Sequence, residues 1–184
     1  MKDLILILGG NGAGKSGYAL SRGENLGPRK YYLATAQALD EEMAERINRH
    51  KKERSESWTT LEEAIKVPDA FGFLNKRADV VVIDCISRWL SHLLMIRNDY
   101  DIMAEAQMLL STIARVDFSV IVVSDEIGCG VTPSDPVSRR YVDTMSQTHR
   151  ALASMANEVY FMVAGIPLMV KSNSHFADDA NVSL

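Results

Sequence analysis

The chain has 184 residues, of which 47% are hydrophobic and 24% charged, and its formal net charge is −4 with a pI near 5.6. This length and composition predict one globular domain, and the negative charge argues against nucleic acid as the main partner. No apolar run approaches the roughly 20 residues of a membrane span, and Cys85 and Cys129 lack a metal-binding spacing. We therefore expect a cytoplasmic protein with one folded domain over residues 1–171 and a flexible tail over 172–184.

The first predicted elements surround a glycine-rich loop. A short apolar run over Leu4–Leu8 fits a strand, and an amphipathic pattern over Lys15–Leu26 predicts a helix. The chain between them reads G-x-x-x-x-G-K-S, which is the spacing of a phosphate-binding loop. The candidate nucleotide-binding residues of this loop are Gly9, Gly10, Asn11, Gly12, Ala13, Gly14, Lys15 and Ser16. In that role Lys15 contacts the β and γ phosphates and Ser16 a Mg²⁺ ion, and the alternative is a purely structural turn.

A strand over Tyr31–Ala34 is followed by a predicted helix over Asp40–Lys51 that carries a histidine. Spacings of four and three residues place three side chains on one helix face, namely Met43, Ile47 and His50. Arg46 lies one turn before His50, and Arg54 lies near it in sequence. Cationic neighbours favour a neutral, nucleophilic imidazole, and guanidinium groups suit phosphate oxygens. The spacing alone equally allows His50 to be an ordinary, partly exposed helix residue.

The third apolar run, Val80–Ile83, ends at Asp84, where a carboxylate can hold Mg²⁺ through water or simply end a strand. The fourth run, Val120–Val123, precedes Asp125 and Glu126. Open α/β folds bind ligands at the carboxyl edge of the sheet, so we expect Glu126 to contact nucleotide or metal, with a solvated turn as the alternative.

The remaining patterns complete an alternation of strands and helices. Helical patterns cover Ser87–Leu94, Ile102–Ala114 and Pro136–Met155, and a last apolar run covers Val159–Val163. This alternation predicts an α/β fold with a mostly parallel central sheet flanked by helices and joined by right-handed crossovers. We expect His92 to take part in packing or in a contact between subunits. We expect His149 to lie on a helix surface, with a substrate contact as the alternative.

Residues 4–171 resemble the bifunctional adenosylcobinamide kinase/adenosylcobinamide-phosphate guanylyltransferase family. The similar segments, in chain order, read LILGGNGAGKS, YYLATAQALDEEMAERINRHKKERSESW, VVVIDCISRWLSHLL, VIVVSDEIGCGVTPSDPVSRRYVD and VYFMVAGIPLMVK. The second segment is the most specific, because common P-loop kinases lack A-T-A followed by D-x-E-M-x-x-R-I-x-x-H.

The resemblance implies a RecA-like P-loop NTPase fold, one catalytic domain and a homotrimer with active sites shared between subunits. It also implies two reactions that need Mg²⁺: ATP or GTP phosphorylates adenosylcobinamide, and GMP then passes from GTP to adenosylcobinamide phosphate. By the same resemblance His50 carries the GMP as a covalent intermediate and Lys15 is catalytic. Arg46 and Arg54 are our candidates for holding the triphosphate, and Asp84 and Ser16 for the metal.

The chain departs from this family pattern at several polar positions. Asn11, Gly12 and Ala13 fill the middle of a loop that usually carries an arginine and a serine. Further departures replace asparagine or glycine at Asp125, Asp135, Ser146 and His149. Two alternatives therefore stay open: a P-loop kinase of another small hydroxylated metabolite without a covalent intermediate, and a nucleotide-binding regulatory subunit.

Overall fold

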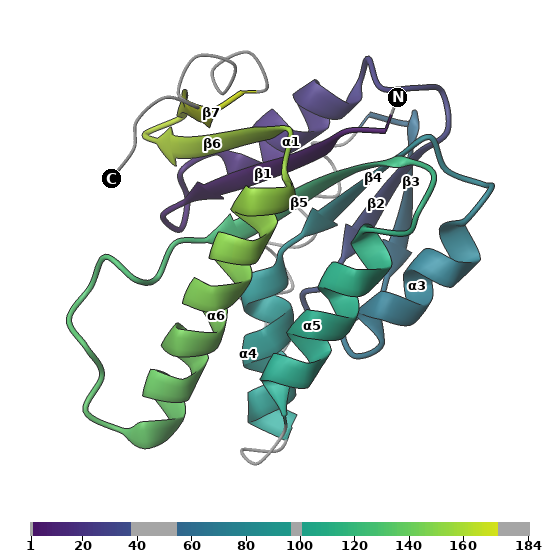
Figure 1. Cartoon of the computed structure of the whole chain (residues 1–184). Helices are drawn as coiled ribbons and strands as arrows, with labels where there is room; N and C mark the ends of the chain where they lie inside the picture. Colours follow the sequence, from purple (N-terminus) through teal and green to yellow (C-terminus); the bar gives the residue numbers. More distant parts are fainter. Residues whose placement is uncertain (1, 38–54, 97–100, 173–184) are drawn as a thin grey trace, which may run out of the picture.

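A computed structural model of the chain describes residues 2–37, 55–96 and 101–172. Its centre is a seven-stranded sheet of order β3-β2-β4-β5-β1-β6-β7, shown in Figure 1. The strands are β1 (Leu4–Gly9), β2 (Lys30–Ala34), β3 (Trp58–Glu62), β4 (Val80–Asp84), β5 (Ser119–Asp125), β6 (Glu158–Val163) and β7 (Ile166–Lys171). All neighbouring pairs are parallel except β6 with β7. This confirms the predicted α/β fold with a mostly parallel sheet.

The helices cover both faces of this sheet. They are α1 (Lys15–Gly23), α3 (Val67–Leu74), α4 (Ile86–Ile96), α5 (Ile102–Ile113) and α6 (Pro136–Met155). Helix α1 packs on one face, against β4 and β5, and the other four helices lie on the opposite face (Figure 1). None of the helices that the structure describes is both long and apolar enough to cross a membrane.

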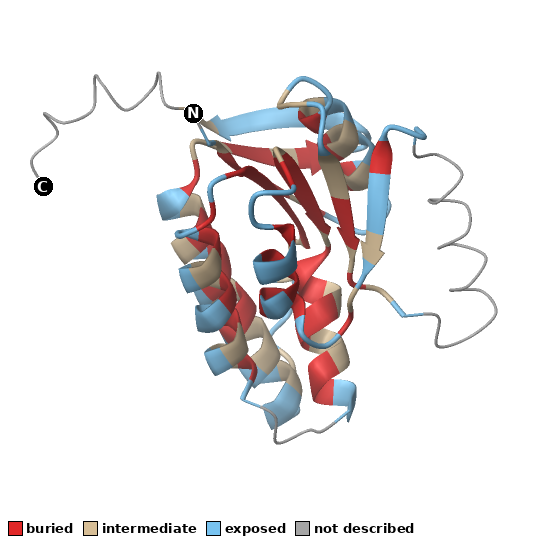
Figure 2. Ribbon diagram, turned by 90° about the vertical axis from the view of Figure 1, so that its right-hand side faces the viewer, coloured by how far each residue is buried: buried red, intermediate tan, exposed pale blue. Residues whose placement is uncertain are grey.

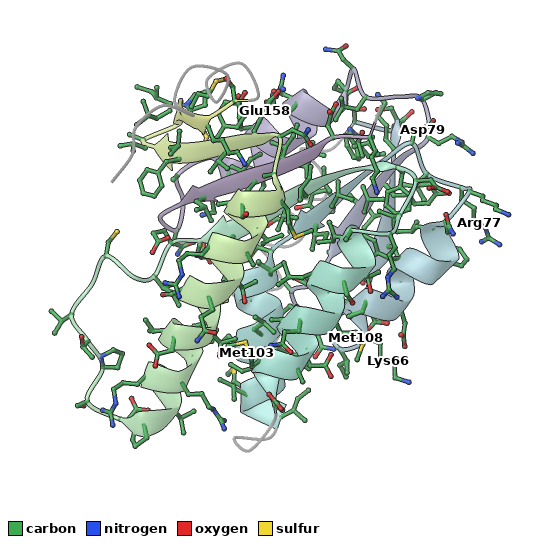
Figure 3. All side chains as sticks on the ribbon, in the orientation of Figure 1. Lys66, Arg77, Asp79, Met103, Met108 and Glu158 are labelled. Atoms are coloured by element: carbon green, nitrogen blue, oxygen red, sulfur yellow. The ribbon has the colours of Figure 1, made fainter. Side chains whose placement is uncertain are left out.

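The central strands are apolar because helices cover them on both sides. Residues Val80–Ile83 and Val120–Val123 are all buried, and Figure 2 shows these strands as the buried middle layer. Each helix instead buries the side chains of one face only, the face that packs against the hydrophobic core. In α5 the buried side chains recur at helical spacing, at Ile102, Ala106, Leu109 and Ile113. Met108, on the outer side of α5 in Figure 3, is half exposed.

Helix α6 spans the predicted residues, and the structure explains one of the departures from the family pattern. Asp135 is the N-cap of α6, because its Oδ1 accepts a hydrogen bond from the backbone N–H of Ser138 at 2.8 Å. Pro136 follows at the first helical position, where a missing N–H costs nothing. A carboxylate at this position therefore has a structural role in starting the helix.

The sequence did not predict three of the elements, and one helix is shorter than predicted. Strand β3 lies at a sheet edge and buries only Trp58 fully, so it has no continuous apolar run. Helix α3 has eight residues and a proline at its start, which weakens its pattern. Strand β7 returns antiparallel through a tight turn at Ala164 and Gly165, both with positive φ. Helix α1 ends at Gly23, before the predicted Leu26.

Several predictions fall on parts of the chain that the structure does not describe. The predicted helix over Asp40–Lys51 and residues 173–184 of the predicted tail lie outside the described residues. The boundaries of the expected domain and tail therefore stay predictions.

Gly9, at the end of β1, lies so close to strand β6 that a side chain at this position should destabilise the fold. In Gly9→Ala the new Cβ would lie 2.6 Å from the backbone oxygen of Met162 on the paired strand β6, at a φ of +149°. Neither backbone can yield, so we expect a loss of about 2–4 kcal/mol in the free energy of unfolding, measured with urea. Gly10→Ala is the matched control, because a Cβ there meets no atom within 4 Å. Equal stability of the two variants would contradict this account.

Candidate active site

The glycine-rich loop leaves the carboxyl end of β1 and runs into the first turn of α1. Gly12 and Gly14 have φ of 75° and 88°, which side chains rarely adopt, so glycine is needed at both positions. The loop closes through a hydrogen bond from the Ala13 N–H to the Gly10 carbonyl at 3.2 Å. The N–H of Gly165, in the β6–β7 turn, also donates to the Ala13 carbonyl. The predicted loop is thus held in a strand–loop–helix setting that suits a bound phosphate.

Lys15 is buried at this loop, with 7% of its surface exposed. Its Nζ donates hydrogen bonds to the Gly9 carbonyl at 3.0 Å and the Gly10 carbonyl at 2.6 Å. It also forms an ion pair with Asp125 Oδ1 at 2.7 Å. The ammonium group is therefore fixed beside the loop backbone, where an incoming phosphate can replace the carboxylate as its partner.

Asp125 lies at the carboxyl edge of the sheet, where its position after an apolar run predicts it, but the sequence assigned it no role at the site. It ends β5, and its register partner on β1 is Gly9. Its Oδ2 accepts a hydrogen bond from Ser87 Oγ at 3.0 Å. Burial alone would raise the pKa of Asp125, but the hydrogen bond and charge of Lys15, together with Ser87, lower it. The carboxylate is therefore ionised and tied to both the loop and α4.

Asp84 ends β4, which lies two strands, or about 10 Å, from β1 across the sheet. Its carboxylate accepts a hydrogen bond from the Tyr32 hydroxyl. The Asp84 carbonyl accepts one from the Thr35 N–H at 3.1 Å. Asp84 thus sits at the same edge as the phosphate loop, as the sequence predicts.

The residues assigned to Mg²⁺ have the right chemistry for that ion. Ser16 offers a hydroxyl oxygen from the first turn of α1, and Asp84 offers a carboxylate. Mg²⁺ usually binds one or two protein oxygens and takes its other ligands from water and substrate phosphates. A site completed by a bound nucleotide therefore fits these residues.

The buried His149 pairs with Glu126, which is partly exposed. The Glu126 N–H donates to the Gly9 carbonyl at 3.0 Å, which places Glu126 at the predicted edge. His149 is buried, with Nε2 2.8 Å from Ser124 Oγ and Nδ1 3.5 Å from Glu126 Oε2. Burial lowers the pKa of His149 although Glu126 acts in the opposite direction, so the ring is neutral at pH 7. The prediction of a helix-surface position for His149 was wrong, because its side chain is buried and its ring contacts Ser124 of β5.

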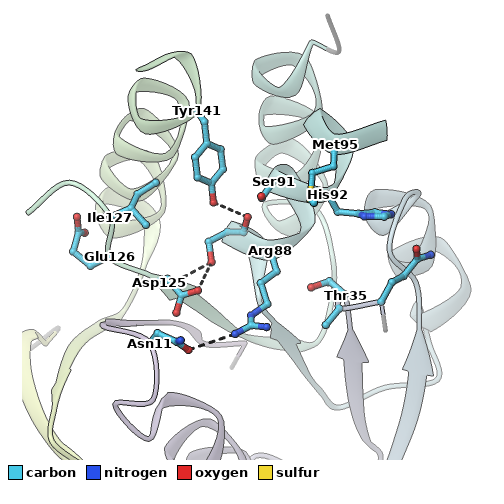
Figure 4. A pocket seen from close by; sticks show the side chains of 13 residues that line it. Asn11, Thr35, Arg88, Ser91, His92, Met95, Asp125, Glu126, Ile127 and Tyr141 are labelled. Atoms are coloured by element: carbon cyan, nitrogen blue, oxygen red, sulfur yellow. Dashed lines mark hydrogen bonds between the residues drawn. The ribbon is translucent and has the colours of Figure 1, made fainter. Parts of the chain in front are cut away.

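A pocket of about 540 Å³ opens against the phosphate loop (Figure 4). Its lining residues come from the loop and from the segments that follow β2, β4 and β5, and they include Asn11, Thr35, Ser87, Arg88, Ser91, His92, Met95, Asp125, Glu126, Ile127 and Tyr141. The Tyr141 hydroxyl donates to the Ser87 carbonyl at 2.7 Å and so ties α6 to α4. His92 lines this pocket and is partly exposed, so it is not a core residue; the other half of its prediction, a contact between subunits, stays a prediction.

Three predicted site residues cannot be placed against this geometry. His50, Arg46 and Arg54 lie outside the described residues. Their roles rest on the sequence pattern alone.

Comparison with known proteins identifies a family and close relatives. The sequence model of the family described as cobinamide kinase / cobinamide phosphate guanyltransferase matches residues 5–170. The bifunctional adenosylcobalamin biosynthesis protein CobP of Pseudomonas aeruginosa PAO1 is 37% identical over 171 residues, covering 93% of this chain and 98% of the relative. The bifunctional adenosylcobalamin biosynthesis protein CobU of Escherichia coli K12 is 31% identical over 182 residues, covering 91% and 99%.

A solved structure supports the fold class. An ATPase of the type III secretion system of pathogenic bacteria superposes with a TM-score of 0.53 at 12% sequence identity. The match covers 91% of this chain but 56% of that ATPase. The likeness concerns the fold alone, and it agrees with the mostly parallel sheet and the strand–loop–helix arrangement of the phosphate loop.

Proposed function

The chain belongs to the cobinamide kinase / cobinamide phosphate guanyltransferase family, and on that premise we propose that it carries out both reactions in cobalamin biosynthesis. ATP or GTP phosphorylates adenosylcobinamide, and GMP from GTP is then transferred to adenosylcobinamide phosphate to give adenosylcobinamide-GDP. The observation that carries this proposal is the pocket that opens directly against the phosphate loop, with Asn11 in both. A nucleotide bound in the loop and a cobinamide acceptor bound in the pocket would meet at Asn11.

In the kinase step the loop and Lys15 hold the donor. The acceptor hydroxyl oxygen bonds to the γ phosphorus, the bond from that phosphorus to the β–γ bridging oxygen breaks, and the hydroxyl proton leaves to water. Negative charge grows on the transferring and bridging oxygens. Loop N–H groups and the Lys15 ammonium stabilise this charge without having to reorganise. Mg²⁺ held by Ser16 and Asp84 would neutralise further phosphate charge when bound.

In the guanylyl step we assign the nucleophile to His50. An unprotonated ring nitrogen bonds to the α phosphorus of GTP, and the bond from that phosphorus to the α–β bridging oxygen breaks to release pyrophosphate. A phosphate oxygen of the phosphorylated acceptor then bonds to the same phosphorus as the P–N bond breaks. The imidazole is thereby restored. Two displacements replace one difficult transfer, which is the usual advantage of covalent catalysis.

The decisive experiment follows two labels in the wild-type protein with Mg²⁺, first without an acceptor and then with cobinamide added. GTP labelled on the α phosphate should leave a label on the protein that is stable in base and lost in acid, as expected of a P–N bond. Peptide mapping should find the label in the segment that contains His50. GTP labelled on the γ phosphate should leave no label on the protein but should label added cobinamide.

The other outcomes separate the two alternatives. Transfer of the γ label without a protein adduct would leave a plain kinase. Tight nucleotide binding without release of ADP, GDP or pyrophosphate would indicate a regulatory subunit.

Assembly into a homotrimer and a cytoplasmic location belong to the same proposal. Apolar side chains on β7 support an interface between copies: Ile166, Leu168, Met169 and Val170 are each more than half exposed. Large exposed apolar surfaces usually mark contact with another macromolecule.

A further inference from the structure

Arg88 lies where the pocket meets the phosphate loop. It follows Ser87 in the first turn of α4, and its Nη2 donates to Asn11 Oδ1 at 3.4 Å. Figure 4 shows the guanidinium directed toward Asn11, between Asp125 and Thr35. A side chain that extends from the pocket wall to the loop is in reach of a group transferred from one to the other.

The other charged side chains that the structure describes around the pocket are acidic, so the positive charge of Arg88 matters for binding a phosphate there. Asp125 and Glu126 also line it, and Asp125 is already paired with Lys15. Arg88 is the one permanently cationic side chain among the described lining residues. Its charge acts on its neighbours: burial raises the pKa of Tyr141, and Arg88 opposes that rise. A phosphate entering this partly acidic pocket therefore has a single strong cationic partner on the pocket wall.

The order of the two proposed reactions places a new phosphate at this point. The γ-phosphoryl group passes from the loop to the acceptor hydroxyl, so the phosphate monoester forms at the border that Arg88 spans. Phosphorylation adds about two negative charges to the acceptor. A planar guanidinium can bind such a group through two parallel hydrogen bonds, which an ammonium cannot do.

We infer that Arg88 binds the phosphate monoester of the phosphorylated acceptor and so distinguishes it from the unphosphorylated one. This inference rests on the proposed function. Arg88 contributes little to binding of the neutral hydroxyl acceptor in the kinase step. It retains the product of that step for the guanylyl transfer that follows.

The test compares the two acceptors in Arg88→Met, which keeps an apolar stem but no charge. The KM for cobinamide phosphate in the guanylyl step should rise about 10–100-fold, the range for loss of a hydrogen bond to a charged group. The KM for cobinamide in the kinase step should change less than about threefold. Arg88→Lys should give an intermediate KM for cobinamide phosphate. Lysine keeps the positive charge but cannot donate two parallel hydrogen bonds to the phosphate.

The controls separate this inference from the function on which it rests. Arg150→Met removes an exposed arginine on α6 that does not line the pocket, and both KM values should match the wild type. A wild-type protein that performs neither reaction would refute the proposed function whatever Arg88 does. If the wild type performs both, equal increases in the two KM values, or an increase only in the KM for nucleotide, would overturn the role of Arg88. Direct binding of cobinamide phosphate to folded Arg88→Lys provides the same comparison if Arg88→Met does not fold.

Discussion

Lys15→Ala is expected to lower kcat for γ-phosphoryl transfer by about 10²–10³-fold, the usual cost of removing one preorganised donor from a transition state. Lys15 Nζ is already held 3.0 Å and 2.6 Å from the carbonyl oxygens of Gly9 and Gly10, so little reorganisation is needed when a phosphate arrives. The loop N–H groups would remain, and they should support the residual rate. The measurement is the initial rate of label transfer from γ-labelled nucleotide to cobinamide at saturating substrates.

This substitution also leaves Asp125 without its ion-pair partner, so a lower rate could reflect a damaged fold. The double variant Lys15→Ala, Asp125→Asn removes the unpaired carboxylate and should recover much of the stability lost in Lys15→Ala, judged by thermal unfolding. Its rate should stay low, because an amide at position 125 offers no cation to the phosphate. Recovery of the rate together with the stability would show that Lys15 acts through the fold and not on the transferring group.

The central part of the fold was predictable because its physical signals are local. Val80–Ile83 and Val120–Val123 are continuous apolar runs, as strands covered on both faces require, and both are central strands. Strand β3 lacked that signal, since an edge strand that buries only Trp58 fully has little reason to be apolar throughout. Strand β7 is apolar yet exposed, so its pairing depends on the tight turn at Ala164 and Gly165 and not on burial.

The site was predictable where one short segment carries the chemistry. The phosphate loop and Asp84 are recognisable from spacing and from position after a strand. The pairing of Lys15 with Asp125 is not, because these residues are 110 positions apart and meet only when β1 and β5 adjoin. Arg88 gave no signal either, since a single arginine near a helix start is common. Its position at the pocket depends on how α4 packs.

His149 shows the limit of reasoning from a helical pattern. Its sequence neighbours are polar, as on a helix surface, namely Gln147, Thr148 and Arg150. In the structure Ser124 of β5 and Glu126, which follows that strand, supply polar partners, so the ring is buried without being unpaired. When the hydrogen-bond partners of a buried polar side chain are distant in sequence, the residues next to it cannot reveal that it is buried.

His50→Ala is expected to abolish guanylyl transfer while phosphoryl transfer continues. The substitution removes the only nitrogen assigned to attack the α phosphorus, and loss of a nucleophile of this kind typically lowers a rate by about 10³-fold or more. The kinase step uses the loop, Lys15 and the acceptor hydroxyl, none of which is changed. The measurement is paired: α-labelled GTP should no longer label the protein, and γ-labelled GTP should still phosphorylate cobinamide at a rate within about threefold of the wild type.

His175→Ala is the matched control, since this histidine lies beyond residues 5–170, which match the family. The control should form the α-labelled adduct as fast as the wild type. A persistent adduct in His50→Ala would move the nucleophile to another side chain and leave the two-step scheme intact. Loss of both labels would instead mean that His50 supports nucleotide binding in general, because a residue that only carries GMP has no part in moving the γ phosphate. The two reactions share the phosphate loop, so only a variant that separates them can assign His50 to one.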